Sequence, residues 1–194
     1  MLSQIKTRRF SLEEYHRLIA LNFFQDERVE LIRGELVNMA AKGTAHATCC
    51  RNLVRELGKL VMGIAELQCQ DPITLSSGSE PEPDFAIVRS PADNYLLAHP
   101  TPADIFLVIE IADSFLNYDR DVKLPLYAEA NISHYWIFNL VANQLETYSE
   151  PFQDSENNCD YRFKRIFLAN QSVELPLPSS PSFDLSKVFS LRKF

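Results

Sequence analysis

Ile105-Phe106-Leu107-Val108-Ile109-Glu110-Ile111 is the stretch of sequence that decides the fold. Apolar side chains occupy nearly every position, which is the pattern of a central β-strand covered on both faces. The single charge in the run is Glu110. Because an ionised carboxylate buried without a partner costs several kcal/mol, we expect Glu110 to be paired, hydrogen-bonded or bound to a metal ion.

Helical and strand patterns surround this run in alternation. A long helix is predicted from Thr44 to about Leu67, where apolar residues recur at steps of three and four. A second helix is predicted over 119–130, and Pro125 within it favours a start close before the proline or a kink. The other strands of this region are predicted at 67–75, 84–89, 104–112 and 134–140, with 143–149 as a hairpin partner of the last. The order predicts an α/β (mixed α+β) fold, with a mixed central β-sheet flanked by helices on both faces.

The remaining segments are expected to flank this core. Ser11 and Glu14 have the spacing of a capping box, which predicts a helix from Ser11 to about Leu21. The other predictions are a hairpin at 29–37, a loop at 150–160, peripheral strands at 161–168 and 172–175, and a closing helix at 182–189. We expect one domain over 1–194, with an N-terminal helix and hairpin at 10–40, a core at 44–150 and a C-terminal part at 160–190.

Composition limits the kind of protein. Of 194 residues, 46% are hydrophobic and 23% charged, a balance typical of a globular protein with a substantial core. No apolar run approaches the roughly 20 residues of a membrane-spanning helix, and no signal peptide is visible at the N-terminus. We therefore expect a cytoplasmic protein with no membrane partner. The four cysteines lack a C-x-x-C spacing, so reduced thiols are expected rather than a disulfide framework or a zinc site.

Two carboxylates and a lysine stand out as candidates for chemistry. Asp84 precedes the strand Phe85-Ala86-Ile87-Val88, and Glu110 lies in the neighbouring predicted strand. Two such carboxylates at related heights would form an oxygen-rich pocket for a hard cation such as Mg²⁺. Lys123, at the start of the following helix, could position a water molecule or stabilise charge on a phosphate.

Several stretches of the chain resemble a known family. Pro83-Asp84 followed by Glu110-Ile111-Ala112 is similar to the PD-(D/E)XK nuclease signature. The Uma-type restriction endonuclease family resembles the chain more narrowly, over about residues 10–150. The stretches that carry this resemblance are 29–36, His46, Pro83-Asp84, 107–111, Asp119 with Lys123 and Tyr127, and 134–137.

The resemblance implies a restriction-endonuclease-like core, hydrolysis of phosphodiester bonds that depends on Mg²⁺ or Mn²⁺, a nucleic-acid partner with DNA favoured, and a homodimer. It places Asp84, Glu110 and the backbone carbonyl of Ile111 on metal-ligand positions, and Lys123 in the role of the signature lysine. Ala112 departs from the signature, because a lysine is usual there. The resemblance suggests that the lysine has moved to the next helix. Glu35, His46 and Glu30 are expected in supporting roles: Glu35 at a second metal position, and His46 near a phosphate or a ligand.

Other functions stay open at this point. A nuclease-like fold that has lost cleavage could act as a nucleic-acid-binding or protein-interaction module, an alternative supported by Ala112 and by the net charge of −7. Proteins that coat nucleic acid are usually basic, so positive charge would have to be local or shared across an oligomer. A metal-dependent hydrolase of another phosphoester is a third alternative. Asp119 is interpreted as the N-cap of the following helix rather than as a metal ligand.

Overall fold

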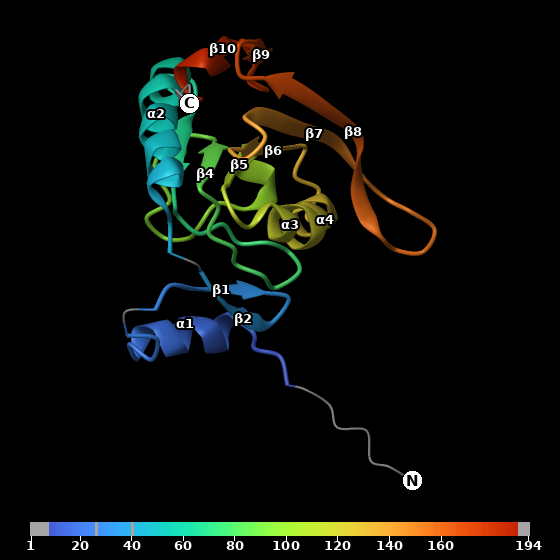
Figure 1. Cartoon of the computed structure of the whole chain (residues 1–194). Helices are drawn as coiled ribbons and strands as arrows, with labels where there is room; N and C mark the ends of the chain where they lie inside the picture. The colour runs from blue at the N-terminus through green and yellow to red at the C-terminus, as the bar shows by residue number, and fades with distance from the viewer. Residues whose placement is uncertain (1–7, 26, 40, 190–194) are drawn as a thin grey trace.

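A six-stranded mixed β-sheet forms the centre of the protein (Figure 1). The computed structural model describes residues 8–25, 27–39 and 41–189. The strands lie in chain order across the sheet, and only β5 and β6 run parallel. Their bounds are β3 (Glu66–Cys69), β4 (Phe85–Val88), β5 (Ile105–Ala112), β6 (His134–Asn139), β7 (Gln144–Gln153) and β8 (Cys159–Leu168). The expected mixed sheet is confirmed.

Helices cover both faces of this sheet, as expected. On one face, α2 (Thr44–Val61) packs on Leu107, Ile109 and Ile111 of β5, which belong to the same apolar cluster. On the other face lie α3 (Leu116–Tyr118), a π-helical turn η2 (Asp119–Lys123) and α4 (Leu124–Glu129). Successive side chains of a strand alternate between faces, so Glu110 points toward the side of α4. β5 is buried on both faces, and Glu110, its one charged residue, lies on the face where Lys123 of η2 can reach it.

The π-helical turn is a local consequence of sequence. The predicted helix over 119–130 begins earlier, at Leu116, and is interrupted by η2. Pro125 has no backbone N–H, so the carbonyl four residues before it receives no helical hydrogen bond from that position. The N–H of Leu124 donates to the oxygen of Asp119, five residues back. This wider turn brings Asp119 and Lys123 to buried positions on the same stretch of helix.

The N-terminal part follows the sequence predictions. The Ser11–Glu14 capping box begins α1 (Leu12–Ala20). The hairpin of β1 (Val29–Ile32) and β2 (Glu35–Asn38) turns at Arg33 and Gly34, both with positive φ. At Gly34 a Cβ would lie 2.6 Å from the Cβ of Arg9, so the turn excludes a larger residue. The backbone groups of Leu31 and Glu80 pair with each other and join this hairpin to the loop before β4.

Two boundaries near α2 differ from the predictions. The helix ends at Val61 rather than near Leu67, and Gly63 adopts φ +75° just beyond it, a conformation that no continuing helix contains. The strand predicted over 67–75 is shorter, since β3 ends at Cys69. Gln70 then adopts φ +59°, which breaks the strand.

The predicted loop at 150–160 is shorter in the structure, which has a turn only at 154–158. There β7 and β8 continue as an antiparallel ribbon, with pairs as far out as Gln153 and Cys159, and Figure 1 shows it extending beyond the rest of the sheet. The Asp154 carboxylate accepts from the N–H groups of Glu156 and Asn158 and so stabilises the tight turn. Polar residues suit such a ribbon because most of its side chains face water.

The closing helix predicted at 182–189 is wrong. The structure has a short strand there, β10 (Ser182–Asp184), paired with β9 (Ser172–Glu174), followed by a single 3₁₀ turn, η3 (Leu185–Lys187). The Asp184 side chain accepts from the N–H of Ser186 and begins that turn. Among the residues described, none of the helices has the length and apolar content needed to cross a membrane.

Candidate active site

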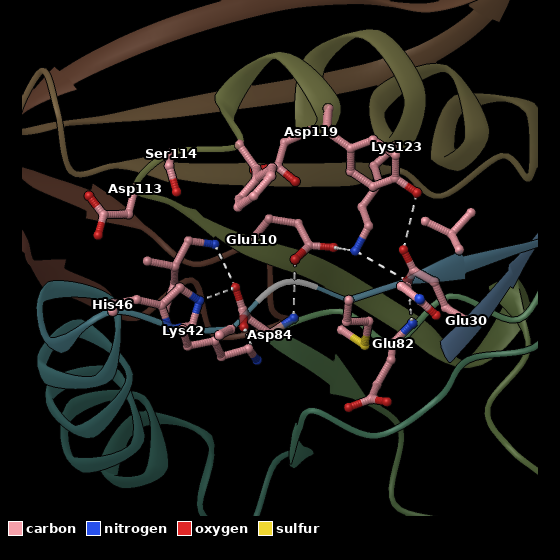
Figure 2. A pocket seen from close by; sticks show the side chains of 18 residues that line it. Glu30, Lys42, His46, Glu82, Asp84, Glu110, Asp113, Ser114, Asp119 and Lys123 are labelled. Carbon is pink, nitrogen blue, oxygen red and sulfur yellow. Dashed lines mark hydrogen bonds and ion pairs between the residues drawn. The ribbon is translucent and has the colours of Figure 1, made fainter. Parts of the chain in front are cut away.

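A cavity of about 230 Å³ opens beside the ends of β4 and β5. Its walls come from the β1–β2 hairpin, the loop that leads into α2, and the helical segment after β5 (Figure 2). Charged side chains dominate the lining, and carboxylates outnumber cations: Glu30, Glu82, Asp84, Glu110, Asp113 and Asp119 face Lys42, Lys123 and His46. An excess of buried carboxylates is unfavourable by itself, so this cavity is suited to a cation.

Asp84 lies at the centre of this lining. Its Oδ1 accepts from Lys42 Nζ at 2.8 Å, and its Oδ2 accepts from His46 Nε2 and from the N–H of Ile111, both at 2.9 Å. Burial alone would raise the pKa of Asp84, but the hydrogen bonds and charges of His46 and Lys42 outweigh it and lower the pKa to about 2. Asp84 is therefore ionised at neutral pH.

Glu110 is the neighbouring carboxylate. Its Oε1 accepts from Lys123 Nζ at 2.8 Å and from the Tyr127 hydroxyl at 2.9 Å. Its Oε2 accepts from the N–H of Asp84 at 3.2 Å. Burial raises the pKa of Glu110, and the charge of Asp84 adds to this effect, although Lys123 opposes it. The buried strand charge thus has the cationic partner that the sequence required.

Lys123 reaches Glu110 despite the alanine at position 112. Its Nζ lies between the carboxylates of Glu110 and Glu30, at 2.8 and 3.4 Å. Burial disfavours the ammonium, but the charges of Glu110 and Glu30 outweigh burial and raise the pKa of Lys123. Glu110 and Ala112 lie two apart on β5 and face the same side. An ammonium from the next helix therefore lies on the face where a lysine at 112 would project.

The supporting residues separate into two groups. Glu30 and His46 line the cavity: Glu30 accepts from the N–H of Glu82 at 3.1 Å and from the Tyr118 hydroxyl at 3.2 Å, and His46 contacts Asp84. Glu35 does not line it, since its exposed side chain pairs with Arg9 at 3.7 Å. Glu35 is the exposed first residue of β2, next to the turn, whereas Val37 and Asn38 further along the strand line the cavity.

The sequence analysis missed two residues of this cavity. Asp119, interpreted as a helix cap, lies inside η2 with only 6% of its surface exposed. Within 8–25, 27–39 and 41–189, no group donates a hydrogen bond to the Asp119 carboxylate. Burial raises the pKa of Asp119 to about 8, and the charge of Glu110 adds to this effect. Asp119 and Lys123 are four residues apart, and residues with this spacing share one face of a helix. The sequence could therefore have indicated that Asp119 lies near Lys123. Lys42 lies in a loop, and nothing in its sequence context distinguishes it from other lysines.

The carboxylates of Asp84, Glu110 and Asp119 offer oxygen donors for a divalent cation, although among the described residues they do not form a set whose donor atoms all lie within 4.8 Å of one another. Each of Asp84 and Glu110 accepts three hydrogen bonds, although an ionised carboxylate offers about four acceptor sites. Asp119 accepts none from the described residues, and the raised pKa shows the cost of keeping it charged beside other acids. A cation would relieve that repulsion. The oxygen donor set of Asp84, Glu110 and Asp119 is the type that Mg²⁺ and Mn²⁺ prefer.

A solved structure shares this fold. A crystal structure described as that of "a putative nuclease belonging to DUF820" from Anabaena variabilis superposes with a TM-score of 0.69. The match covers 93% of this chain and 97% of that one, at 15% sequence identity, and shows a shared fold.

The family follows from the sequence itself. The Uma2 family model, described as "Putative restriction endonuclease", matches residues 12–186. The chain therefore belongs to the Uma2 family, which confirms the resemblance noted above. No curated protein matches the chain.

Proposed function

We propose that this chain is a metal-dependent endonuclease that hydrolyses phosphodiester bonds of DNA. One observation carries the proposal: Asp84, Glu110 and Lys123, from two strands and a helical turn, converge on one cavity through direct hydrogen bonds. The convergence of an acid pair and an ammonium supports phosphoester chemistry, because hydrolysis requires both a bound cation and positive charge beside the phosphate.

The metal ligands in this proposal are Asp84 and Glu110, with the backbone carbonyl of Ile111 and the carboxylate of Asp119 as further oxygens. A bound Mg²⁺ or Mn²⁺ would polarise the phosphate and lower the pKa of a coordinated water. The protein fixes both main ligands through backbone N–H groups, those of Ile111 and Asp84. Such main-chain hydrogen bonds hold the carboxylates in place before any cation arrives.

Lys123 acts as a donor and not as a base. Its raised pKa keeps it protonated, so it can orient a water or stabilise negative charge on a phosphate but cannot accept a proton. Tyr127 has a pKa raised well above its usual value by burial, and then by the charge of Glu110, so its hydroxyl remains a donor to Glu110. The two donors hold the Glu110 carboxylate between them, and Lys123 also contacts Glu30.

The mouth of the cavity offers contacts for a nucleic-acid substrate. Phe115 lines it with 55% of its surface exposed, and Tyr118 lies three residues further along. An exposed ring next to a phosphate-binding site is suited to stacking on a nucleobase. Lys42 adds a positive charge on the same side as Asp84 (Figure 2).

Nicking of supercoiled plasmid DNA tests the proposal. We expect nicking by the full chain with Mg²⁺ or Mn²⁺, none with a chelator, and a loss of at least about 100-fold in Asp84→Asn and Glu110→Gln. Glu156→Gln is the matched control, because Glu156 lies in the exposed turn between β7 and β8. Equal nicking by all four proteins would refute the proposal, as would nicking that the chelator leaves unchanged.

A second function is favoured by the ion pairs of the cavity. Asp84 is already paired with Lys42 and hydrogen-bonded to His46, and Glu110 is paired with Lys123. A cavity whose acids are satisfied by the protein's own cations is also suited to a binding module without cleavage. DNA binding that needs no metal, with no nicking under any metal tested, would favour that module. The homodimer and the cytoplasmic location stay predictions, the first tested by light scattering on the purified chain.

A further inference from the structure

A second group of potential metal ligands lies on the α2 side of Asp84. The donor atoms of His46, Cys50 and Asp84 lie within 4.8 Å of one another. His46 and Cys50 are four residues apart on α2, so they project from the same face of the helix. Asp84 arrives from the entry to β4. This set therefore combines one nitrogen, one sulfur and one oxygen donor from two elements that the fold holds rigidly.

His46 faces this set through one ring nitrogen. Its ring is buried, and Nε2 contacts Asp84 at 2.9 Å. Nε2 is therefore the nitrogen that would bind an ion jointly with Asp84. The other nitrogen, Nδ1, is buried without a hydrogen-bond partner among residues 8–25, 27–39 and 41–189, and would carry the imidazole proton.

A polarising contact adjoins the set. Nε2 of Gln70 donates a hydrogen bond to the Cys50 sulfur at 3.8 Å. The cysteine spacing in the sequence did not predict this arrangement, because the three donor residues come from a helix and from the entry to a strand.

We propose that His46, Cys50 and Asp84 form a binding site for a soft divalent metal of the zinc class. Thiolate and imidazole ligands select such ions, whereas the carboxylates deeper in the cavity suit Mg²⁺. Asp84 belongs to both sets, so a zinc ion would take a ligand from the hard cation. Zinc is then an inhibitor of cleavage, a consequence that rests on the proposed nuclease function, whereas the site itself does not.

Cobalt(II) absorption tests the site without reference to activity. The full chain, reduced with a phosphine, is titrated with Co²⁺ in place of zinc. We expect a thiolate-to-cobalt charge-transfer band in the near ultraviolet. Cys50→Ser should abolish the band and weaken Co²⁺ binding at least about 10-fold. Cys159→Ser is the matched control, since Cys159 lies on β8, outside the set, and should leave the band unchanged.

The outcomes separate this proposal from the nuclease proposal. Glu110→Gln should keep the cobalt band, because Glu110 is outside the set, while it abolishes nicking. A wild-type chain that binds no Co²⁺, or binds it without a thiolate band, overturns the proposal whether or not any variant folds. A band that persists in Cys50→Ser overturns it as well. A cobalt band in a chain that never nicks DNA leaves the metal site intact and refutes only the nuclease.

Discussion

The backbone N–H of Asp84 donates a hydrogen bond to the carboxylate of Glu110 over 3.2 Å. The pairing of β4 with β5 explains this contact, because Phe85 lies opposite Ile109 and the next pair in the same register is Asp84 with Glu110. The register therefore places Asp84 and Glu110 opposite each other where the two strands meet the cavity. Sheet register alone places the two acids in one cavity, before any side-chain ion pair is considered.

Lys123 should be needed for stability as well as for chemistry. Lys123→Met leaves Glu110 and Glu30 buried without their ammonium, so we expect the free energy of unfolding to fall by about 3–5 kcal/mol. Urea denaturation measures this. Adding Glu110→Gln should recover part of the loss, because the neutral amide no longer needs a counter-ion.

Lys187→Met is the matched control for that experiment. Lys187 is exposed in η3, 3.9 Å from Asp184, and its loss should change stability by no more than about 0.5 kcal/mol. A loss below about 1 kcal/mol for Lys123→Met would show that the buried ion pair is not what the cavity depends on.

Phe115 should matter for substrate binding and not for turnover. Phe115→Ala removes the exposed ring at the mouth of the cavity, so we expect single-stranded DNA to bind more weakly by about 1–3 kcal/mol. Fluorescence anisotropy measures the affinity in the presence of Ca²⁺, and nicking at saturating DNA should change little. Val141→Ala, another exposed apolar residue outside the cavity, should bind as wild type does. Equal binding by all three proteins would exclude stacking on Phe115.

Acid should destabilise the protein through Glu146. This fully buried carboxylate of β7 accepts from Arg120, Lys164, Asn139 and Tyr148. Burial alone would raise the pKa of Glu146, but the hydrogen bonds, that of Arg120 foremost, outweigh it and lower the pKa well below the usual value of 4.5. The folded state therefore binds its proton less readily than the unfolded state. The stabilisation is complete above about pH 5 and is lost as the pH falls through the usual value toward the lowered one.

Denaturation at pH 7 and pH 3 tests this dependence. Glu146→Gln should be less stable than wild type at pH 7, and its difference from wild type should shrink at pH 3. Glu156→Gln keeps the wild-type dependence, since Glu156 is exposed. If Glu146→Gln loses as much stability as wild type between the two pH values, Glu146 does not cause the acid sensitivity.

The parts predictable from sequence were those set by local patterns. The apolar run at 105–111 fixed the central strand and made Glu110 a buried charge in need of a cation. The family resemblance pointed to Lys123, which the structure brings within 2.8 Å of Glu110. Lys42 could not be predicted, because it reaches Asp84 from a loop 42 residues earlier, and only the tertiary fold makes that contact.

The predictions that differ from the structure also have physical explanations. Residues 150–160 are polar because a two-stranded ribbon exposes most of its side chains, and the same composition suits a loop. Asp119 has the sequence features of a helix cap, but Pro125 shifts the helical register so that Asp119 falls inside a π-helical turn, facing other acids. Glu35 was expected in a supporting role but lies outside the cavity, because it is the exposed first residue of β2 and only the later residues of that strand reach the lining.

Direct Mn²⁺ binding tests the central claim, that Asp84 and Glu110 share one divalent cation. Titration of the full chain, followed by the electron paramagnetic resonance of free Mn²⁺, should show one ion bound per chain in the wild type and in Glu156→Gln. Asp84→Asn and Glu110→Gln should each bind at least about 10-fold more weakly. Wild-type affinity in both single variants would contradict the account and leave the cavity as a set of ion pairs within the protein.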